Sequence, residues 1–264
     1  MKETVKFNGK SIDYFKFGNG GKIFVIIPGL SVKSVTESER AIVKDYRLFE
    51  NDYTAYCFDR INEMGNTYSI SEMADDYIEA FDALGIKDAY VFGASQGGMI
   101  AQFVAMKRKD LIKKMALGSS APSIDINQFK HIEELIKLAE EKKRAELFST
   151  FATAIYPEEF YEKYKRAFEF ISKTVTDNEL KRFITCAKAL KNFDVFDKLN
   201  EIKCDTLFVS DKTDKLIGDI SGVINGLKLD NVKAICLDGY GHAAYDIAPN
   251  YKEIIYKFFE KSEI

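Results

Sequence analysis

The feature of this sequence that most constrains its fold is a repeated alternation of apolar, strand-like runs with segments of helical spacing. The run KIFVIIPGL is continuously apolar, which is typical of a strand buried on both faces of a sheet. The runs YTAYCFD, AYVFG, IKKMALG, TLFVSD and VKAICLD follow it along the chain. Near the N-terminus, TVKFN and SIDYFKF alternate apolar and polar residues and predict an antiparallel hairpin. The pattern predicts an α/β fold with a mostly parallel sheet and helical crossovers.

The alternation is interrupted once, by a long segment that has only helical spacing. It stops after GSSAPS and resumes at TLFVSD. We therefore expect one α/β core formed by residues 1–122 and 200–264, with residues 123–199 as an inserted all-helical module. The insertion is rich in phenylalanine and tyrosine, and we expect some of these rings to form an apolar roof over a binding pocket.

Charge and composition exclude several classes of partner. A formal net charge of −3 and a pI of about 5.7 leave no basic surface for nucleic acid or anionic membranes. The N-terminus lacks the apolar run of a signal peptide, and no stretch approaches the roughly 20 apolar residues of a membrane span. The four cysteines are scattered without any CxxC, which argues against disulfides or a zinc site. We expect a cytoplasmic protein whose partner is a small molecule, and the oligomeric state stays open.

A serine stands where one strand-like run meets the following helical segment. Gly93-Ala94-Ser95-Gln96-Gly97 fits the pattern G-x-S-x-G of a nucleophile elbow, a sharp strand-to-helix turn. Such a turn crowds the strand against the helix, and the two glycines relieve the crowding because they lack a Cβ. A plain turn with serine as helix cap is the alternative. The setting favours Ser95 as a nucleophile.

A serine nucleophile needs a base and a third group that orients the base. The chain contains only two histidines. His131 lies in a charged helical segment, where exposure at the surface is the expected role, whereas His242 follows the last strand-like run. Because parallel strands place their carboxyl ends at one edge of a sheet, His242 and Ser95 should meet there.

The orienting acid should lie at the same edge of the sheet. The segment SDKTD, which follows the penultimate strand-like run, offers Asp211 and Asp214, and the longer reach of Asp214 favours it. Asp246 and Asp125 are weaker candidates. The alternative for all four aspartates is that they are solvated carboxylates in loops, with no catalytic role.

The order Ser95, Asp214, His242 along the chain is that of the α/β-hydrolase triad. Residues 22–121 and 203–262 resemble the α/β-hydrolase superfamily through GASQGG, FDRINEMGNTYS, SDKTD and GYGHAAYDIAP. The resemblance implies the α/β-hydrolase fold, a mostly parallel eight-stranded sheet flanked by helices. It also implies that residues 123–199 take the place of that family's helical cap over the active site.

The resemblance further implies an oxyanion hole formed by the backbone N–H groups of Leu30 and Gln96, with Ser31 as an alternative donor. Two positions depart from the family pattern. Pro28–Gly29 stands where members commonly have His-Gly. Asp211 stands where members usually have glycine, so two carboxylates compete as the orienting acid.

These features predict a serine hydrolase that cleaves a small or medium, partly apolar carboxylic ester through an acyl-enzyme on Ser95. The same three side chains would serve an acyltransferase or a carbon–carbon bond hydrolase, and a non-catalytic ligand-binding member of the fold is a further alternative. The sequence has no Walker loop, zinc-ligand spacing or dinucleotide glycine pattern, so we expect neither cofactor nor metal.

Overall fold

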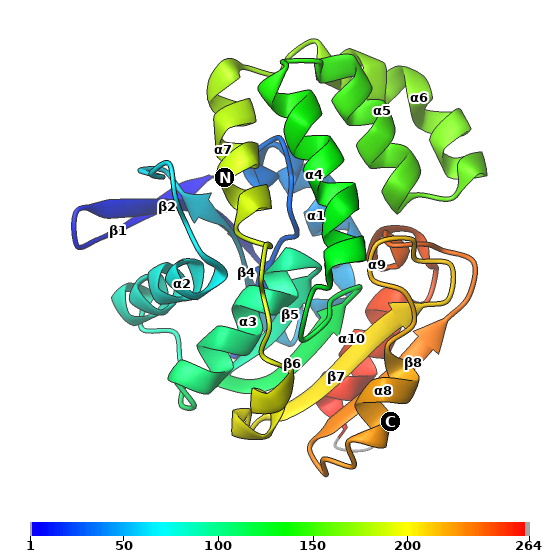
Figure 1. Ribbon diagram of the computed structural model, residues 1–264. Coiled ribbons are helices and arrows are strands. Elements are labelled where there is room, and N and C mark those ends of the chain that lie inside the picture. Colours follow the sequence, from blue (N-terminus) through cyan, green and yellow to red (C-terminus); the bar gives the residue numbers. More distant parts are fainter. Residues whose placement is uncertain (1, 262–264) are drawn as a thin grey trace.

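An eight-stranded sheet forms the centre of the computed structural model, which describes residues 2–261 (Figure 1). Met1 and residues 262–264, at the two ends of the predicted core, lie outside the described residues. The strands are β1 (Glu3–Phe7), β2 (Lys10–Phe17), β3 (Lys22–Ile27), β4 (Tyr53–Ile61), β5 (Ala89–Ala94), β6 (Ile112–Gly118), β7 (Asp205–Asp211) and β8 (Val232–Leu237). Their order across the sheet is β1-β2-β4-β3-β5-β6-β7-β8.

The pairing of the strands confirms the predicted, mostly parallel sheet. Strands β1 and β2 form the expected antiparallel hairpin, and β2 pairs antiparallel with β4. The pairs β4–β3, β3–β5, β5–β6, β6–β7 and β7–β8 are all parallel. The six strands from β3 to β8 therefore end at a common edge, where the loops that follow them can meet.

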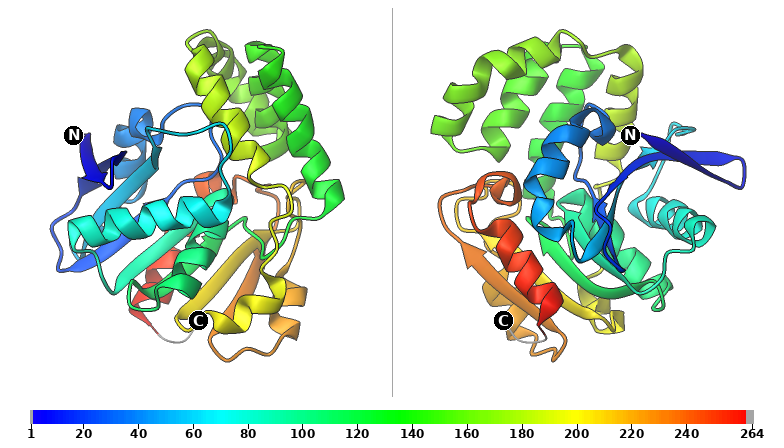
Figure 2. Two further views of the ribbon diagram at one scale, coloured as in Figure 1. Left: turned by 60° about the vertical axis from the view of Figure 1, so that its left-hand side comes forward. Right: turned by 180° about the vertical axis from the view of Figure 1, so that it is seen from behind.

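Helices fill the connections and cover both faces of the sheet. The α-helices are α1 (Glu39–Asp45), α2 (Ile70–Leu84), α3 (Gln96–Lys107), α4 (Ile126–Glu140), α5 (Arg144–Ile155), α6 (Glu158–Ser172), α7 (Asp177–Lys188), α8 (Ser221–Gly226), α9 (Ala244–Ile247) and α10 (Tyr251–Glu260). Short 3₁₀-helices are η1 (Val35–Ser38), η2 (Arg47–Phe49) and η3 (Phe196–Glu201). Helices α2 and α3 lie on one face of the sheet, and α1 and α10 lie on the other (Figure 2). None of the helices between residues 2 and 261 has the length and apolarity needed to span a bilayer.

The apolar run of β3 is buried on both sides because successive side chains of a strand point to opposite faces. Val25 and Ile27 belong to the cluster that packs under α2 and α3. Phe24 and Ile26 belong to the cluster under α10, which is rich in aromatic rings. A strand that supplies apolar side chains to both layers has no polar alternation, which explains the continuous run in the sequence.

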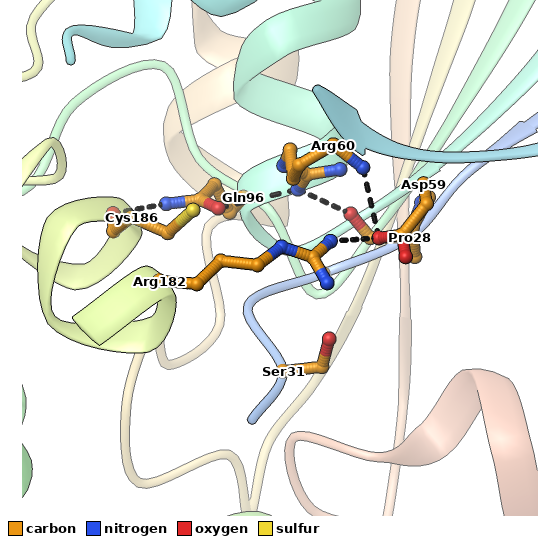
Figure 3. Close-up of a pocket in the computed structure, with 8 residues that line it drawn as sticks. Pro28, Ser31, Asp59, Arg60, Gln96, Arg182 and Cys186 are labelled. Atoms are coloured by element: carbon orange, nitrogen blue, oxygen red, sulfur yellow. Dashed lines mark hydrogen bonds and ion pairs between the residues drawn. The ribbon is translucent and has the colours of Figure 1, made fainter. Parts of the chain in front are cut away.

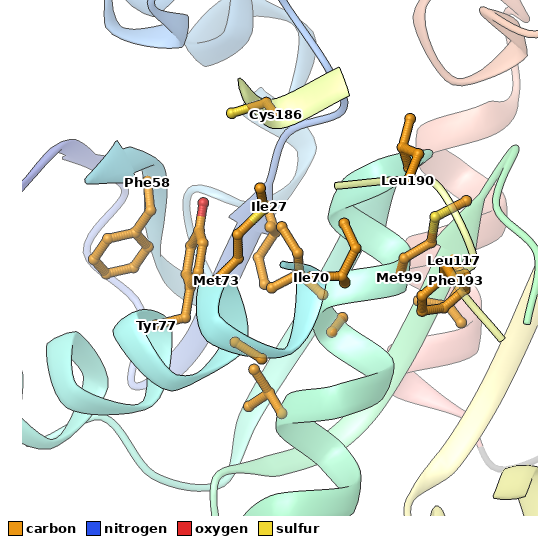
Figure 4. Close-up of a cluster of buried hydrophobic side chains, with 14 of the residues drawn as sticks. Ile27, Phe58, Ile70, Met73, Tyr77, Met99, Leu117, Cys186, Leu190 and Phe193 are labelled. Atoms are coloured by element: carbon orange, nitrogen blue, oxygen red, sulfur yellow. The ribbon is translucent and has the colours of Figure 1, made fainter. Parts of the chain in front are cut away.

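Helices α4 to α7 lie between β6 and β7 in the chain and stand beside the carboxyl edge of the sheet (Figure 1). The chain leaves and re-enters the core at one place, because Val195 N donates to Pro122 O at 2.8 Å and Ser123 bridges Asp194. Apolar side chains of these helices join the cluster under α2 and α3. Figure 4 shows Cys186 and Leu190 together with core members such as Met99. This shared core seats the inserted helices on the sheet.

We expect Phe24→Ala to lower the free energy of unfolding by about 3–5 kcal/mol, because it empties a fully buried site. The Phe24 ring stacks on Phe49 with centroids 4.6 Å apart and meets the edge of Phe259 at 5.6 Å. Urea denaturation followed by circular dichroism measures the change. The matched control is Phe170→Ala, since Phe170 is 70% exposed and its loss should alter stability by less than about 0.5 kcal/mol. Equal effects of the two substitutions would contradict the packing described for β3.

Candidate active site

Ser95 occupies a strained backbone conformation at the turn between β5 and α3. Its φ is 47° and its ψ is −118°, a region that residues with a side chain rarely adopt. The Ser95 N–H donates to Gly118 O at the end of β6 at 2.7 Å, which anchors the turn to the sheet. The neighbouring strand thus holds the hydroxyl-bearing residue at the carboxyl edge.

The glycines around Ser95 permit an approach that no side chain would allow. A Cβ placed on Gly97 would lie 2.1 Å from Ile27 O, the last carbonyl of β3. A Cβ on Gly93 would lie 2.6 Å from the Cα of Gly98, and one on Gly98 would lie 2.5 Å from Ser120 Oγ. The crowding expected at a strand-to-helix turn is therefore present on both sides of the serine.

Three of the predicted site residues lie in series at this edge. His242 Nε2 is 2.9 Å from Ser95 Oγ, and His242 Nδ1 is 2.8 Å from Asp214 Oδ2. The imidazole is 4% exposed, and the Asp214 side chain has no exposed surface. The second carboxylate oxygen, Oδ1, accepts the N–H groups of Leu216 at 2.8 Å and Ile217 at 3.0 Å. Both oxygens of Asp214 are therefore engaged, which fixes the orientation of its carboxylate toward the imidazole.

The charge state of Asp214 follows from its surroundings. Burial acts to raise the pKa of its carboxyl, but His242 and the two backbone donors outweigh burial and hold the pKa below its usual value. Asp214 is therefore ionised at neutral pH.

Asp211, the other carboxylate weighed from the sequence, points to the backbone and not to the imidazole. It is fully buried, and its Oδ1 accepts from the N–H and hydroxyl of Thr213, at 2.9 and 2.6 Å. The same carboxylate accepts the N–H groups of Tyr240 and Gly241, both at 3.1 Å. Asp211 thus ties the loop that precedes His242 to the loop that carries Asp214.

The remaining candidates from the sequence have other partners. Asp125 caps α4 by accepting the N–H groups of Asn127 and Gln128. Asp246 Oδ2 accepts the hydroxyl of Tyr156 at 3.2 Å. His131 is exposed on α4, as predicted.

The loop after β3 lies against the turn that carries Ser95. A Cβ placed on Gly29 would be 3.3 Å from Ser95 Cβ, so this loop passes beside the serine one residue before Leu30. The Ser31 hydroxyl donates to Lys33 O at 2.9 Å, which engages the alternative donor within its own loop. Gln96 is the first residue of α3, where a helix leaves its N–H groups without partners inside the helix.

A cavity of about 530 Å³ opens onto Ser95 and His242. Its volume is typical of small-molecule sites, and its walls are mostly apolar. The inserted segment contributes Ile132, Phe148, Phe151, Ala152, Ile155, Tyr156, Phe168, Ile171 and Leu190. Two carboxylates, Asp45 and Asp246, also lie in the lining.

Sequence reasoning missed two features of the site. The Gln96 side chain, considered only for its backbone, is held by Arg60 and by a carbonyl of α7 (Figure 3). Arg60 lies in the motif FDRINEMGNTYS, but nothing in the motif indicates which groups its side chain would contact.

No three histidine, cysteine, aspartate or glutamate side chains within the described part of the chain are grouped to hold a metal ion.

Comparisons with known proteins identify the family and the fold. A family model described as alpha/beta hydrolase fold matches residues 29–249, which is most of the chain. Among curated proteins, 3-oxoadipate enol-lactonase 2 of Acinetobacter baylyi is 21% identical over 219 residues, covering 81% of this chain and 80% of its own.

Two solved structures show the same fold. An alpha/beta hydrolase enzyme from a Medee basin deep-sea metagenome library superposes with a TM-score of 0.87, at 21% identity, over 99% of this chain and 98% of its own. An esterase from Exiguobacterium antarcticum gives a TM-score of 0.82, at 20% identity, over 99% of this chain and 100% of its own.

We expect Gly97→Ala to lower the free energy of unfolding by about 3 kcal/mol, because the new Cβ would overlap the backbone oxygen atoms of Ile27 and Pro28. These atoms lie at the end of β3 and cannot move independently of the sheet. The matched control is Gly222→Ala in α8, where a Cβ meets nothing within 4 Å and stability should change by no more than about 1 kcal/mol. Urea denaturation measures both. A Gly97→Ala protein as stable as the Gly222→Ala protein would contradict the close approach of α3 to β3.

We expect Asp214 to contribute stability at neutral pH that is lost in acid. A carboxyl whose pKa is lower in the folded state stabilises the fold above its unfolded pKa, about 3.9, and the contribution disappears as the pH falls through the folded value. The stability difference between the wild type and Asp214→Asn should therefore be larger at pH 7 than at pH 3. Urea denaturation at both values measures it, and a difference that grows in acid would contradict the lowered pKa.

Proposed function

Since the chain belongs to the α/β-hydrolase family, we propose that it is a serine hydrolase that cleaves small or medium, partly apolar carboxylic esters through an acyl-enzyme on Ser95. The observation that carries the proposal is the continuous series of contacts from Ser95 Oγ through the His242 imidazole to the Asp214 carboxylate, at 2.9 and 2.8 Å. This is the arrangement in which a neutral serine becomes a nucleophile.

In the first half of the reaction, Ser95 Oγ attacks the ester carbonyl carbon while His242 Nε2 takes the hydroxyl proton. The imidazolium then gives this proton to the departing alcohol oxygen, and the acyl group stays on Ser95. Asp214 holds Nδ1–H, fixes the tautomer and stabilises the imidazolium. In the second half, His242 takes a proton from water, the hydroxide attacks the acyl carbon, and the proton returns to Ser95 Oγ as the acid leaves.

The negative charge that forms on the carbonyl oxygen needs donors that are already in place. We assign this role to the backbone N–H groups of Leu30 and Gln96. The assignment is supported by the contact between the loop after β3 and the Ser95 turn, and by the position of Gln96 at the start of α3. One such donor contributes about 3 kcal/mol to the stability of the transition state.

Residues 123–199 would act as a cap that selects the substrate. Their aromatic and aliphatic side chains line the cavity above Ser95, so an apolar acyl or alcohol portion fits there. The names of two similar proteins, an enol-lactonase and an esterase, support an ester bond, cyclic or open, as the target. The four cysteines are free, which suits the reducing cytoplasm as the place of action.

We expect Ser95→Ala and His242→Ala each to lower kcat for p-nitrophenyl butyrate by about 10³-fold or more, because each removes a group that handles the transferred proton. Release of p-nitrophenol measures the rate. His131→Ala is the matched control, since this second histidine is exposed on α4 and should leave kcat unchanged. Equal rates for His131→Ala and His242→Ala would contradict the assignment of the base.

A fluorophosphonate probe separates the proposed hydrolase from the alternatives. Labelling that Ser95→Ala abolishes supports an enzyme, and a folded wild-type protein that takes no label supports a ligand-binding role. Parallel assays with a lactone, a thioester plus an alcohol acceptor, and a diketone then distinguish hydrolysis from acyl transfer and from carbon–carbon cleavage. Faster turnover of the diketone than of any ester would contradict the proposed substrate class.

A further inference from the structure

A buried arginine contacts both segments that carry the proposed oxyanion donors, the loop of Leu30 and the start of α3 at Gln96. Arg60 is the penultimate residue of β4 and is only 4% exposed. Its Nη2 donates to Pro28 O at 2.7 Å and to Gln96 Oε1 at 3.2 Å (Figure 3). One rigid guanidinium therefore joins the loop after β3 to the first residue of α3.

The charge of Arg60 is not neutralised by a direct partner. Within residues 2–261 it makes no ion pair. Its Nη1 donates to the Tyr77 hydroxyl at 2.8 Å, and that hydroxyl donates to Asp59 O at 2.9 Å, which orients the guanidinium plane. Burying a charge without a carboxylate partner costs free energy, and a neutral donor would satisfy these acceptors at a lower cost. The positive charge has the sign that stabilises an oxyanion forming between the two segments.

Helix α7 is tied to the same group of side chains. Gln96 Nε2 donates to Cys186 O at 2.7 Å, and Arg182 forms an ion pair with the Asp59 carboxylate (Figure 3). The amide of Gln96 is therefore held on both sides, its oxygen by Arg60 and its nitrogen by α7. These contacts connect the inserted helices directly to the residue that follows Ser95.

We propose that Arg60 is a positioning residue for the oxyanion hole, which sets the spacing of the Leu30 and Gln96 N–H groups, with α7 fixing the far side of Gln96. The inference rests on the proposed function. Lysine cannot take this role, because its single ammonium on a flexible stem lacks the planar fork of arginine. A displacement of about 1 Å in a catalytic donor can cost about 10²-fold in rate.

The test compares Arg60→Lys and Arg60→Met with Arg108→Lys, a matched control at the surface where Arg108 pairs with exposed carboxylates. For p-nitrophenyl butyrate we expect the Arg60 variants to lose about 10- to 100-fold in kcat while KM stays within about twofold of the wild type. The rate of fluorophosphonate labelling should fall in parallel, because that reaction also develops negative charge on oxygen. Arg108→Lys should change neither rate.

A purely structural role for Arg60 predicts a different result. It would lower the unfolding midpoint and leave kcat of the folded variants at the wild-type value, or raise KM alone, and either outcome overturns the inference. If Arg60→Met does not fold, Gln96→Leu replaces it, since leucine keeps the backbone N–H and removes both side-chain contacts. The same loss of kcat is expected, and an unchanged kcat overturns the inference.

The two proposals fail in different ways. A wild-type protein that takes no label and turns over no ester overturns the proposed function, and this inference with it. An active wild type with an equally active, folded Arg60→Lys variant overturns this inference alone.

Discussion

The close approach of β5, α3 and β3 at Ser95 is the constraint on which the site depends. Three glycines allow backbone to lie where side chains would overlap, and the strained φ of 47° at Ser95 is held by a hydrogen bond to Gly118 O. The strain is tolerated because the packed sheet and helix determine the turn from several sides. The hydroxyl therefore lies beside the His242 imidazole without a change of backbone, so the proposed reaction needs no reorganisation of its nucleophile.

Around this turn, polar contacts fix the other groups to the same edge. Asp211 joins the loops of Asp214 and His242, and Ile155 O at the end of α5 accepts the N–H of Ala243, directly after the histidine. Through Gln96, helix α7 reaches the turn on the opposite side. The inserted helices thus contact both the side that carries His242 and the side of the proposed oxyanion donors. They also line the cavity, so they would both enclose a substrate and support the proposed reacting groups.

Much of the fold was predictable from the sequence, because uninterrupted apolar runs and helical spacing determine a parallel sheet. That sheet has a single carboxyl edge, which was sufficient to bring Ser95 and His242 together in the prediction. The choice between Asp211 and Asp214 was not predictable with certainty. Asp211 is the last residue of β7 and Asp214 follows it by three residues, and the hydrogen bonds of the turn decide which carboxylate faces the imidazole. Arg60 was missed because its acceptors, a carbonyl oxygen and a side-chain amide, come from distant segments and leave no pattern of residue types.

The most direct test of the account is to identify the residue that becomes acylated. The wild-type protein is mixed with p-nitrophenyl butyrate, quenched in acid before the first turnover is complete, digested, and mapped by mass spectrometry. The account predicts a butyryl group on the peptide that contains Ser95, and none on that peptide when His242 is replaced by alanine. Release of p-nitrophenol without a butyrylated peptide, or with the group on another residue, would contradict it.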